Sequence, residues 1–288
     1  MRSNFEFSLQ TPTFWALIRY ISERRGYSKN DGILSFTFNE IADTLNRDGV
    51  ISTDEDIEKA RQYFIFRSET LNLHFKSMLM DAAKAEDEFF KLKPLHYENQ
   101  YLCKLPLNKQ KGEMRQIAFF TAIINILAER TLRESNFEEY SVQNLPFEDD
   151  PRQLVYILDD DRRFIGSSSR RFDGAFPSII NPIAIWEIKE YYYATTFGSR
   201  IADGVFETQL DGYEFKQIED MHGYHVDHIF FFDAYHTWWD QGKSYLCRIF
   251  DALHMGLVDE VIVGKEVLTR WPELLLSYVE TKMNQTEE

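Results

Sequence analysis

A carboxylate and an amine lie two residues apart in an otherwise apolar segment of the sequence. The segment reads IAIWEIKE at residues 183–190, and the charged pair is Glu187 and Lys189. If the segment is a strand, residues two apart share a face, so both charges point one way while Trp186 and Ile188 point the other way. Charged side chains rarely occupy such a place without a partner or a function.

This pair is suited to metal-assisted hydrolysis of a phosphodiester. A carboxylate binds a hard divalent cation, which lowers the pKa of a bound water and offsets charge on the scissile phosphate. An adjacent lysine can orient that water and stabilise developing negative charge. Because one carboxylate is a weak magnesium site, we expect a second from a neighbouring strand. Asp173, fourteen residues before Glu187, leaves room for a strand, a turn between Pro177 and Pro182, and a return.

The elements that must position these groups alternate between helix and strand. Apolar spacing predicts a long helix at 112–134, strands at 153–158 and 183–190, a helix through 200–210, a strand at 228–235, a helix through 244–256, a strand at 260–264 and a C-terminal helix from Pro272. This order predicts a layered α/β domain.

The first hundred residues are predicted to be helical. Helix-start and helix-stop signals recur there: the N-cap Thr11 with Pro12, the stop Gly26, and the capping boxes Thr37 with Glu40 and Ser52 with Glu55. A longer helix is expected to carry the apolar residues from Leu71 to Ala82. Short capped helices at 37–60 are compatible with a helix-turn-helix or winged-helix module that reads DNA, and equally with an accessory helical bundle.

A domain boundary is expected in the segment 91–111, which contains proline, is mildly basic and lacks periodicity. We therefore expect a helical domain for recognition or dimerisation at 1–105 and an α/β domain at 106–288.

Composition and charge limit the class of protein. Hydrophobic residues make up 44% and charged residues 27%, as in a soluble globular protein with a sizeable core. No apolar run reaches the ~18 residues needed to span a bilayer, and no signal peptide is visible, so no membrane partner is expected. With only two cysteines, a disulfide framework is excluded, which fits a reducing cytoplasm. The net charge of −15 argues against a general nucleic-acid coat, but it permits polyanion binding where positive charge is local or a metal neutralises the contact.

The combination of Asp173 with Glu187-Ile188-Lys189, in a strand that follows a long helix, resembles the PD-(D/E)XK nuclease superfamily, which includes many type II restriction endonucleases. The motif covers about twenty residues, and a compatible order of elements covers roughly 110–265. Phe172 stands where many members have proline, at a position that varies. The same acid-x-Lys spacing occurs at Glu214–Lys216 and Glu280–Lys282, at a predicted helix end and in a polar tail, where residues two apart do not share a face.

The resemblance implies a three-layer α/β/α nuclease core with a mixed central sheet. It implies a DNA endonuclease that depends on Mg²⁺, with Mn²⁺ as a substitute, and that leaves 5′-phosphate and 3′-hydroxyl ends. Asp173, Glu187 and Ile188 are then the metal-binding positions, Lys189 assists the nucleophilic water, and Glu113 on the preceding helix is a further catalytic group. Cutting both strands of double-stranded DNA generally needs two active sites, which implies a homodimer. A type II restriction enzyme or another prokaryotic defence nuclease is the implied setting.

Three arginines are candidates for binding DNA phosphates. Arg170 and Arg171 come just before Asp173, although they could instead offset the acidic residues 159–161 of the same loop. Arg200 opens the predicted helix after the strand and could also reach a phosphate.

Other functions remain open from the sequence. An ordinary salt-bridged strand edge would account for Glu187 and Lys189 without any chemistry. HGYHVDH at 222–228 has the composition of a zinc site, but its spacing across a loop that enters a strand predicts that the ligands do not converge. A non-catalytic DNA-binding or regulatory protein, and a nuclease subunit of repair or transposition, are the alternatives to a restriction enzyme.

Overall fold

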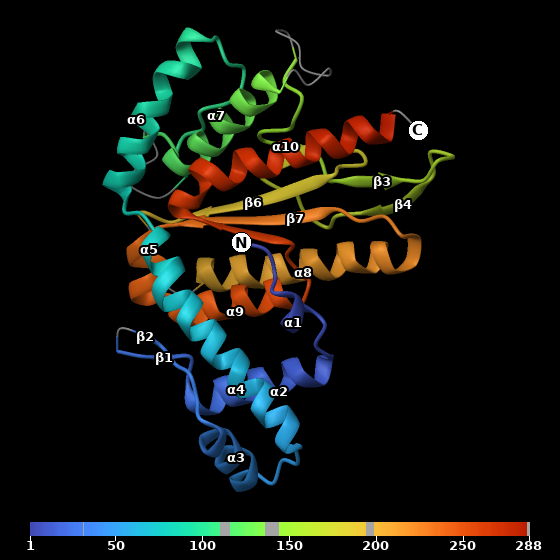
Figure 1. Cartoon of the computed structure of the whole chain (residues 1–288). Helices are drawn as coiled ribbons and strands as arrows, with labels where there is room; N and C mark the ends of the chain where they lie inside the picture. The colour runs from blue at the N-terminus through green and yellow to red at the C-terminus, as the bar shows by residue number, and fades with distance from the viewer. Residues whose placement is uncertain (31, 110–115, 136–143, 194–198, 287–288) are drawn as a thin grey trace.

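The computed structural model describes residues 1–30, 32–109, 116–135, 144–193 and 199–286. Figure 1 shows a central sheet with helices above and below it, and a helical N-terminal region at the bottom of the view. Within the described residues, no helix is both long enough and apolar enough to cross a bilayer.

Four strands form the central sheet. They are β5 (Gly174–Phe176), β6 (Ala184–Glu190), β7 (Asp227–Asp233) and β8 (Glu260–Val263), in the order β5-β6-β7-β8. β5 is antiparallel to β6, whereas β6, β7 and β8 are parallel, so the sheet is mixed. Every residue of β7 is buried, as expected of a central strand covered on both faces. The predicted strands at 183–190, 228–235 and 260–264 are confirmed, with ends shifted by at most two residues.

Helices cover both faces of this sheet. On one face, α7 (Phe119–Glu134) and α10 (Val267–Thr286) share an apolar cluster with Trp186 and Phe231. On the other face, α8 (Ser199–His222) and α9 (Lys243–His254) pack with Phe230 and Phe232. The alternation of Phe230, Phe231 and Phe232 between the two clusters follows from the pleat of the strand. The protein is therefore a mixed α/β protein, as predicted.

The N-terminal region is mainly helical, also as predicted. Its elements are α1 (Phe5–Ser8), α2 (Pro12–Arg25), β1 (Ser28–Lys29), β2 (Gly32–Ile33), α3 (Phe38–Arg47), α4 (Asp54–Glu69), the π-helical η1 (Thr70–Phe75) and α5 (Lys76–Met78). Thr11 caps α2, and the capping box of Thr37 and Glu40 opens α3. The second box was predicted one residue too early, because Thr53 and Asp56 form it.

The N-terminal helices share one apolar core with α9. The Tyr63 hydroxyl donates a hydrogen bond to Asp251 Oδ1 at 2.6 Å, and Arg67 Nη1 lies 3.1 Å from the same oxygen. All three side chains are buried, so removal of one would leave a buried charge or polar group without its partner. These contacts bind the helical region directly to the α/β region.

The connecting segments differ from the sequence prediction at several points. Residues 91–98, predicted to be irregular, form the end of α6 (Ala82–Glu98), with Pro94 inside the helix. The helix expected from 71 to 82 ends at Met78, and Ala82 begins α6. α7 begins at Phe119, because Ile117 just before it pairs with Leu107 in an isolated bridge. Residues 112–115 of the predicted helix lie outside the described residues.

The remaining elements are short or shifted. They are the antiparallel hairpin β3 (Tyr156–Leu158) and β4 (Phe164–Ser167), the π-helical η2 (His236–Gln241) and the 3-10 helix η3 (Gly264–Glu266). β3 is all that forms of the strand predicted at 153–158. The C-terminal helix was predicted to start at Pro272, but it starts at Val267, and Pro272 lies inside it.

Candidate functional site

The pairing of β5 with β6 brings Asp173 beside Glu187. Gly174 pairs with Trp186, and the chain returns from β5 to β6 through the Pro177–Pro182 turn. The Asp173 backbone N donates to the Trp186 carbonyl at 3.0 Å, and Asp173 Oδ2 accepts from the Ile188 N at 2.8 Å. A Cβ on Gly174 would lie 2.0 Å from the Trp186 indole, so the glycine after Asp173 is what allows the strands to approach.

Glu187 and Lys189 lie on the face of β6 that α8 covers. Lys189 Nζ contacts Glu187 Oε1, and it lies 3.3 Å from Glu207 Oε2 of α8. Gly204 of α8 fits closely against Lys189, since a Cβ there would be 3.0 Å from Lys189 Cε. Trp186 is fully buried on the opposite face, as the strand periodicity predicted.

Arg170 forms an ion pair with the second carboxylate oxygen of Glu187. Its Nη2 lies 3.0 Å from Glu187 Oε2 and 2.8 Å from Asp211 Oδ2, and its Nε donates to both Asp211 oxygens at 3.0 Å. Asp211 is completely buried on α8. Arg170 is thus an internal partner of two carboxylates in this structure, and contact with a DNA phosphate would require it to give up part of this pairing.

Burial and crowding of like charges shift the pKa values of these groups. Burial, together with the nearby Glu187, raises the pKa of Asp173 to about 7. Burial also raises the pKa of Asp211 to about 6, although Arg170 acts in the opposite direction. Burial alone would lower the pKa of Lys189, but the attraction of Glu187 outweighs it and raises the pKa, so this amine stays protonated.

The site carries more negative than positive charge. Asp173, Glu187, Glu207 and Asp211 are four carboxylates, and Arg170 and Lys189 are two cations, which leaves a net charge of −2 when all are ionised. A divalent cation would offset that surplus. Two carboxylates are also the donor type that Mg²⁺ and Mn²⁺ prefer, so the residues present fit such an ion.

A cleft of about 690 Å³ opens beside these groups. Asp173, Glu187, Ile188 and Lys189 line one wall. Three further cations line the same cleft; they are Lys104, Lys109 and Arg152. Lys104 pairs with Asp149 at 2.9 Å and Arg152 with Asp150 at 2.8 Å. Because Asp149, Asp150 and Glu190 line the cleft as well, acidic residues outnumber the cations of its lining by one.

The other predicted site residues make no side-chain hydrogen bond or ion pair with this cluster among the described residues, or have side chains that lie outside them. Arg171 is exposed, next to Arg170. Arg200 lies in the first turn of α8, and its side chain lies outside the described residues, as does the whole of Glu113. The sequence reasoning missed Glu207 and Asp211, whose spacing of four residues places both on one face of α8. The spacing alone does not distinguish these two acids from those on a solvated helix face; only the packing of α8 against β6 does.

The histidine-rich segment contributes two residues, His225 and Asp227, to a cluster of ion pairs. His225 Nε2 lies 3.0 Å from Asp227 Oδ1 and 3.7 Å from Asp259 Oδ1, and its Nδ1 lies 3.0 Å from Glu219 Oε1. One possible ligand atom from each of His225, Asp227 and Asp259 lies within 4.8 Å of the others. The expectation holds for the three histidines, because His222 and His228 are not part of this group, but His225 and Asp227 do converge with Asp259.

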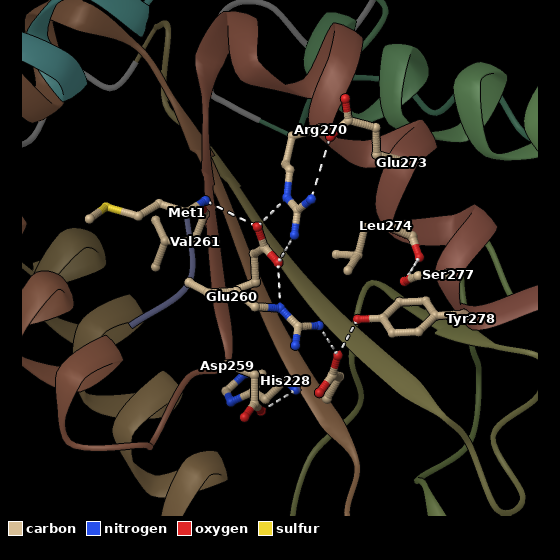
Figure 2. Close-up of polar contacts among 12 residues, drawn as sticks. Met1, His228, Asp259, Glu260, Val261, Arg270, Glu273, Leu274, Ser277 and Tyr278 are labelled. Atoms are coloured by element: carbon tan, nitrogen blue, oxygen red, sulfur yellow. Dashed lines mark hydrogen bonds and ion pairs between the residues drawn. The ribbon is translucent and has the colours of Figure 1, made fainter. Parts of the chain in front are cut away.

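A proton on His225 accounts for this cluster without a metal. The hydrogen bond to Asp227 raises the pKa of His225 to about 9. Asp227 is further held by Arg2 at 2.8 Å and by the Tyr278 hydroxyl. Figure 2 shows the adjoining contacts of Glu260 with Met1 and Arg270 at the edge of the sheet. The cluster thus belongs to a network of ion pairs.

Fold and site together define a mixed α/β protein with an acid–acid–lysine cluster in a cleft beside its sheet. The chain belongs to the family described as Domain of unknown function (DUF7687), whose match covers residues 80–278. Residues 1–74 match a second family of the same kind, Domain of unknown function (DUF7690). No curated protein and no solved structure matches the chain.

Proposed function

We propose that this protein is a metal-dependent DNA endonuclease with a three-layer α/β/α nuclease core. The observation that carries the proposal is that Asp173, just before β5, lies beside Glu187 of β6, with Lys189 alongside, in a cleft with surplus negative charge. An ordinary salt bridge at a strand edge would balance its charges and would not need the second carboxylate.

Asp173 and Glu187 would hold the divalent ion. When bound, Mg²⁺ or Mn²⁺ would lower the pKa of a water and offset the charge on the scissile phosphate. Lys189 is held protonated, so its role would be to orient the attacking oxygen and stabilise negative charge rather than to remove a proton. The water oxygen bonds to phosphorus and the bond to O3′ breaks, which leaves a 5′-phosphate and a 3′-hydroxyl.

The substrate we propose is double-stranded DNA. Lys109 lines the cleft and Arg171 is exposed beside Arg170, so both cations are available for phosphates, and we propose Arg200 as a third. Because two cuts need two sites, we propose a homodimer. Restriction or another form of prokaryotic defence in the cytoplasm is the setting that the family resemblance favours.

The test uses supercoiled plasmid, with Mg²⁺ or with a chelator. Lys189→Met and Glu187→Gln should each lower the nicking rate by roughly 10²-fold or more, since each removes charge at the reacting phosphate. The matched control is Lys216→Met, which alters the same acid-x-Lys spacing on the exposed side of α8 and should cut at the wild-type rate. Cleavage by Lys189→Met at the full rate would contradict the assignment. DNA binding without any cleavage would instead favour the non-catalytic DNA-binding protein.

A further inference from the structure

Both oxygens of Glu187 are occupied by side-chain cations of the protein itself. Lys189 contacts Oε1, and Arg170 Nη2 lies 3.0 Å from Oε2. A divalent ion that binds Glu187 must therefore compete with at least one of these cations. Lys189 lies on the same strand and face as Glu187, whereas Arg170 reaches in from the segment before β5.

Arg170 makes more hydrogen bonds with Asp211 than with Glu187. Arg170 donates three hydrogen bonds to Asp211, at 2.8 to 3.0 Å. It also makes a cation–π contact with Phe172, with Arg170 Cζ 5.4 Å from the ring centroid. Against these stands one contact with Glu187. Release of Glu187 would therefore leave the guanidinium seated on Asp211, with its charge still paired.

The charge of Arg170 opposes the ion directly. A guanidinium that contacts a metal-binding carboxylate lies a few ångströms from the ion, where repulsion between a single and a double charge changes affinity about tenfold or more even under strong screening. Arg171 is the adjacent residue in sequence, but it is exposed and makes no such contact among the described residues.

We propose that Arg170, seated on the buried Asp211, is a built-in counter-charge that competes with the divalent ion for Glu187 and so sets the ion affinity of the site. This rests on the proposed function, because it takes Asp173 and Glu187 as the metal-binding pair. Arg170 is in this view a positioning residue of the metal-free protein, and its release from Glu187 accompanies ion binding.

The experiment measures Mn²⁺ binding to the full chain by calorimetry in the absence of DNA. Arg170→Gln should lower the Kd for Mn²⁺ about tenfold, whereas Arg170→Lys, which keeps the charge, should stay nearer the wild type. Because Arg170→Gln leaves the buried Asp211 without its partner, the variant Arg170→Gln with Asp211→Asn is measured as well. That double variant keeps the net charge and offers a neutral hydrogen-bonded pair, and it should also bind Mn²⁺ more tightly than the wild type. Arg171→Gln is the matched control and should change the Kd less than twofold.

The outcomes separate the two proposals. If wild type binds Mn²⁺ and Glu187→Gln does not, the metal-binding pair stands. Unchanged or weaker binding by Arg170→Gln and by the double variant then overturns the counter-charge alone. If the wild type does not bind Mn²⁺, or Glu187→Gln binds it equally well, the proposed function and this inference both fall. Thermal unfolding of each variant shows that the change in Kd comes from a folded protein.

Discussion

Two groups of carboxylates lie on the same sheet, and only one of them carries uncompensated charge. At the start of β8, Glu260 is fully buried, yet Arg2 Nε lies 3.0 Å and Arg270 Nε 2.6 Å from its oxygens, and its pKa is lowered although burial alone would raise it. On β6, Glu187 is just as well paired, but the neighbouring Asp173 has a pKa raised to about 7. The first group has a cation for each acid, whereas the second has a surplus of acid.

The difference shows that crowding of carboxylates does not by itself indicate a functional site. The Glu260 network, which we define as Arg2, Asp227, Glu260, Arg270 and Tyr278, is explained as a connection between the N-terminal segment and the sheet (Figure 2). Surplus charge that faces a cleft lowers stability, and such a cost is typical of sites that bind a ligand.

The largest expected change in stability concerns Glu260, and its absence would contradict the comparison of the two groups. Glu260→Gln removes the buried charge that pairs with Arg2 and Arg270, so we expect a loss of about 3 kcal/mol in the free energy of unfolding. Chemical denaturation measures it. Glu273→Gln is the control, because Glu273 is 65% exposed in its side chain and pairs only loosely with Arg270 at 3.4 Å. A loss for Glu260→Gln as small as that of the control would show that the network does not hold the sheet edge.

A matched pair of substitutions should give opposite signs in the two groups. Asp227→Asn removes a carboxylate that His225, Arg2 and Tyr278 hold ionised, and should cost about 2 kcal/mol of stability. Asp173→Asn keeps an acceptor for the Ile188 N and removes the surplus charge, and should add about 2 kcal/mol at pH 8 in chelator. Denaturation of both variants at pH 8 tests this. The gain at Asp173 should shrink as the pH falls from 7 and disappear below about pH 3, where the carboxyl is protonated in both the folded and the unfolded state. A loss at Asp173 at pH 8 would mean that its charge is compensated after all.

From the sequence alone, the positions of Asp173, Glu187 and Lys189 could be predicted better than the residues that pack around them. Glu187 and Lys189 lie in a strand because apolar and β-branched residues surround them, and this local signal predicted β6 within one residue. Asp173 could be placed because a return between two prolines has a limited length. Asp211 could not, because its role depends on how α8 packs on β6, and a buried acid on a helix has the same local pattern as an exposed one.

The Glu260 network shows the same limit. Arg2 and Glu260 are separated by almost the whole chain, and their contact depends on the first residues pairing with β8 in a bridge. Thr11 with Pro12, by contrast, predicted the start of α2 correctly, because a helix cap is formed by neighbours in sequence. Pro94 and Pro272 gave wrong predictions, because the first indicated irregular chain and the second a helix start. Each lies inside a helix, where tertiary packing keeps helix on both sides of the proline.

The smallest expected effect concerns His225, which lies beside Asp227 of the Glu260 network. It would sharpen the comparison by showing whether His225 and its neighbouring carboxylates bind a proton or a metal. The folded-state pKa of about 9 lies above the ordinary value of 6.5, so the ion pairs of His225 stabilise the protein below pH 6.5 and lose that effect as the pH rises through 9. Because the His225 side chain is 48% exposed, screening should limit the effect to about 1 kcal/mol. Unfolding of wild type and His225→Gln at pH 6 and pH 9.5 measures it, and the two proteins should differ at the lower pH only. If Zn²⁺ instead raises the stability of wild type at pH 7.5 and leaves His225→Gln unchanged, then His225, Asp227 and Asp259 bind a metal, and surplus acid would no longer distinguish the proposed site from the sheet edge.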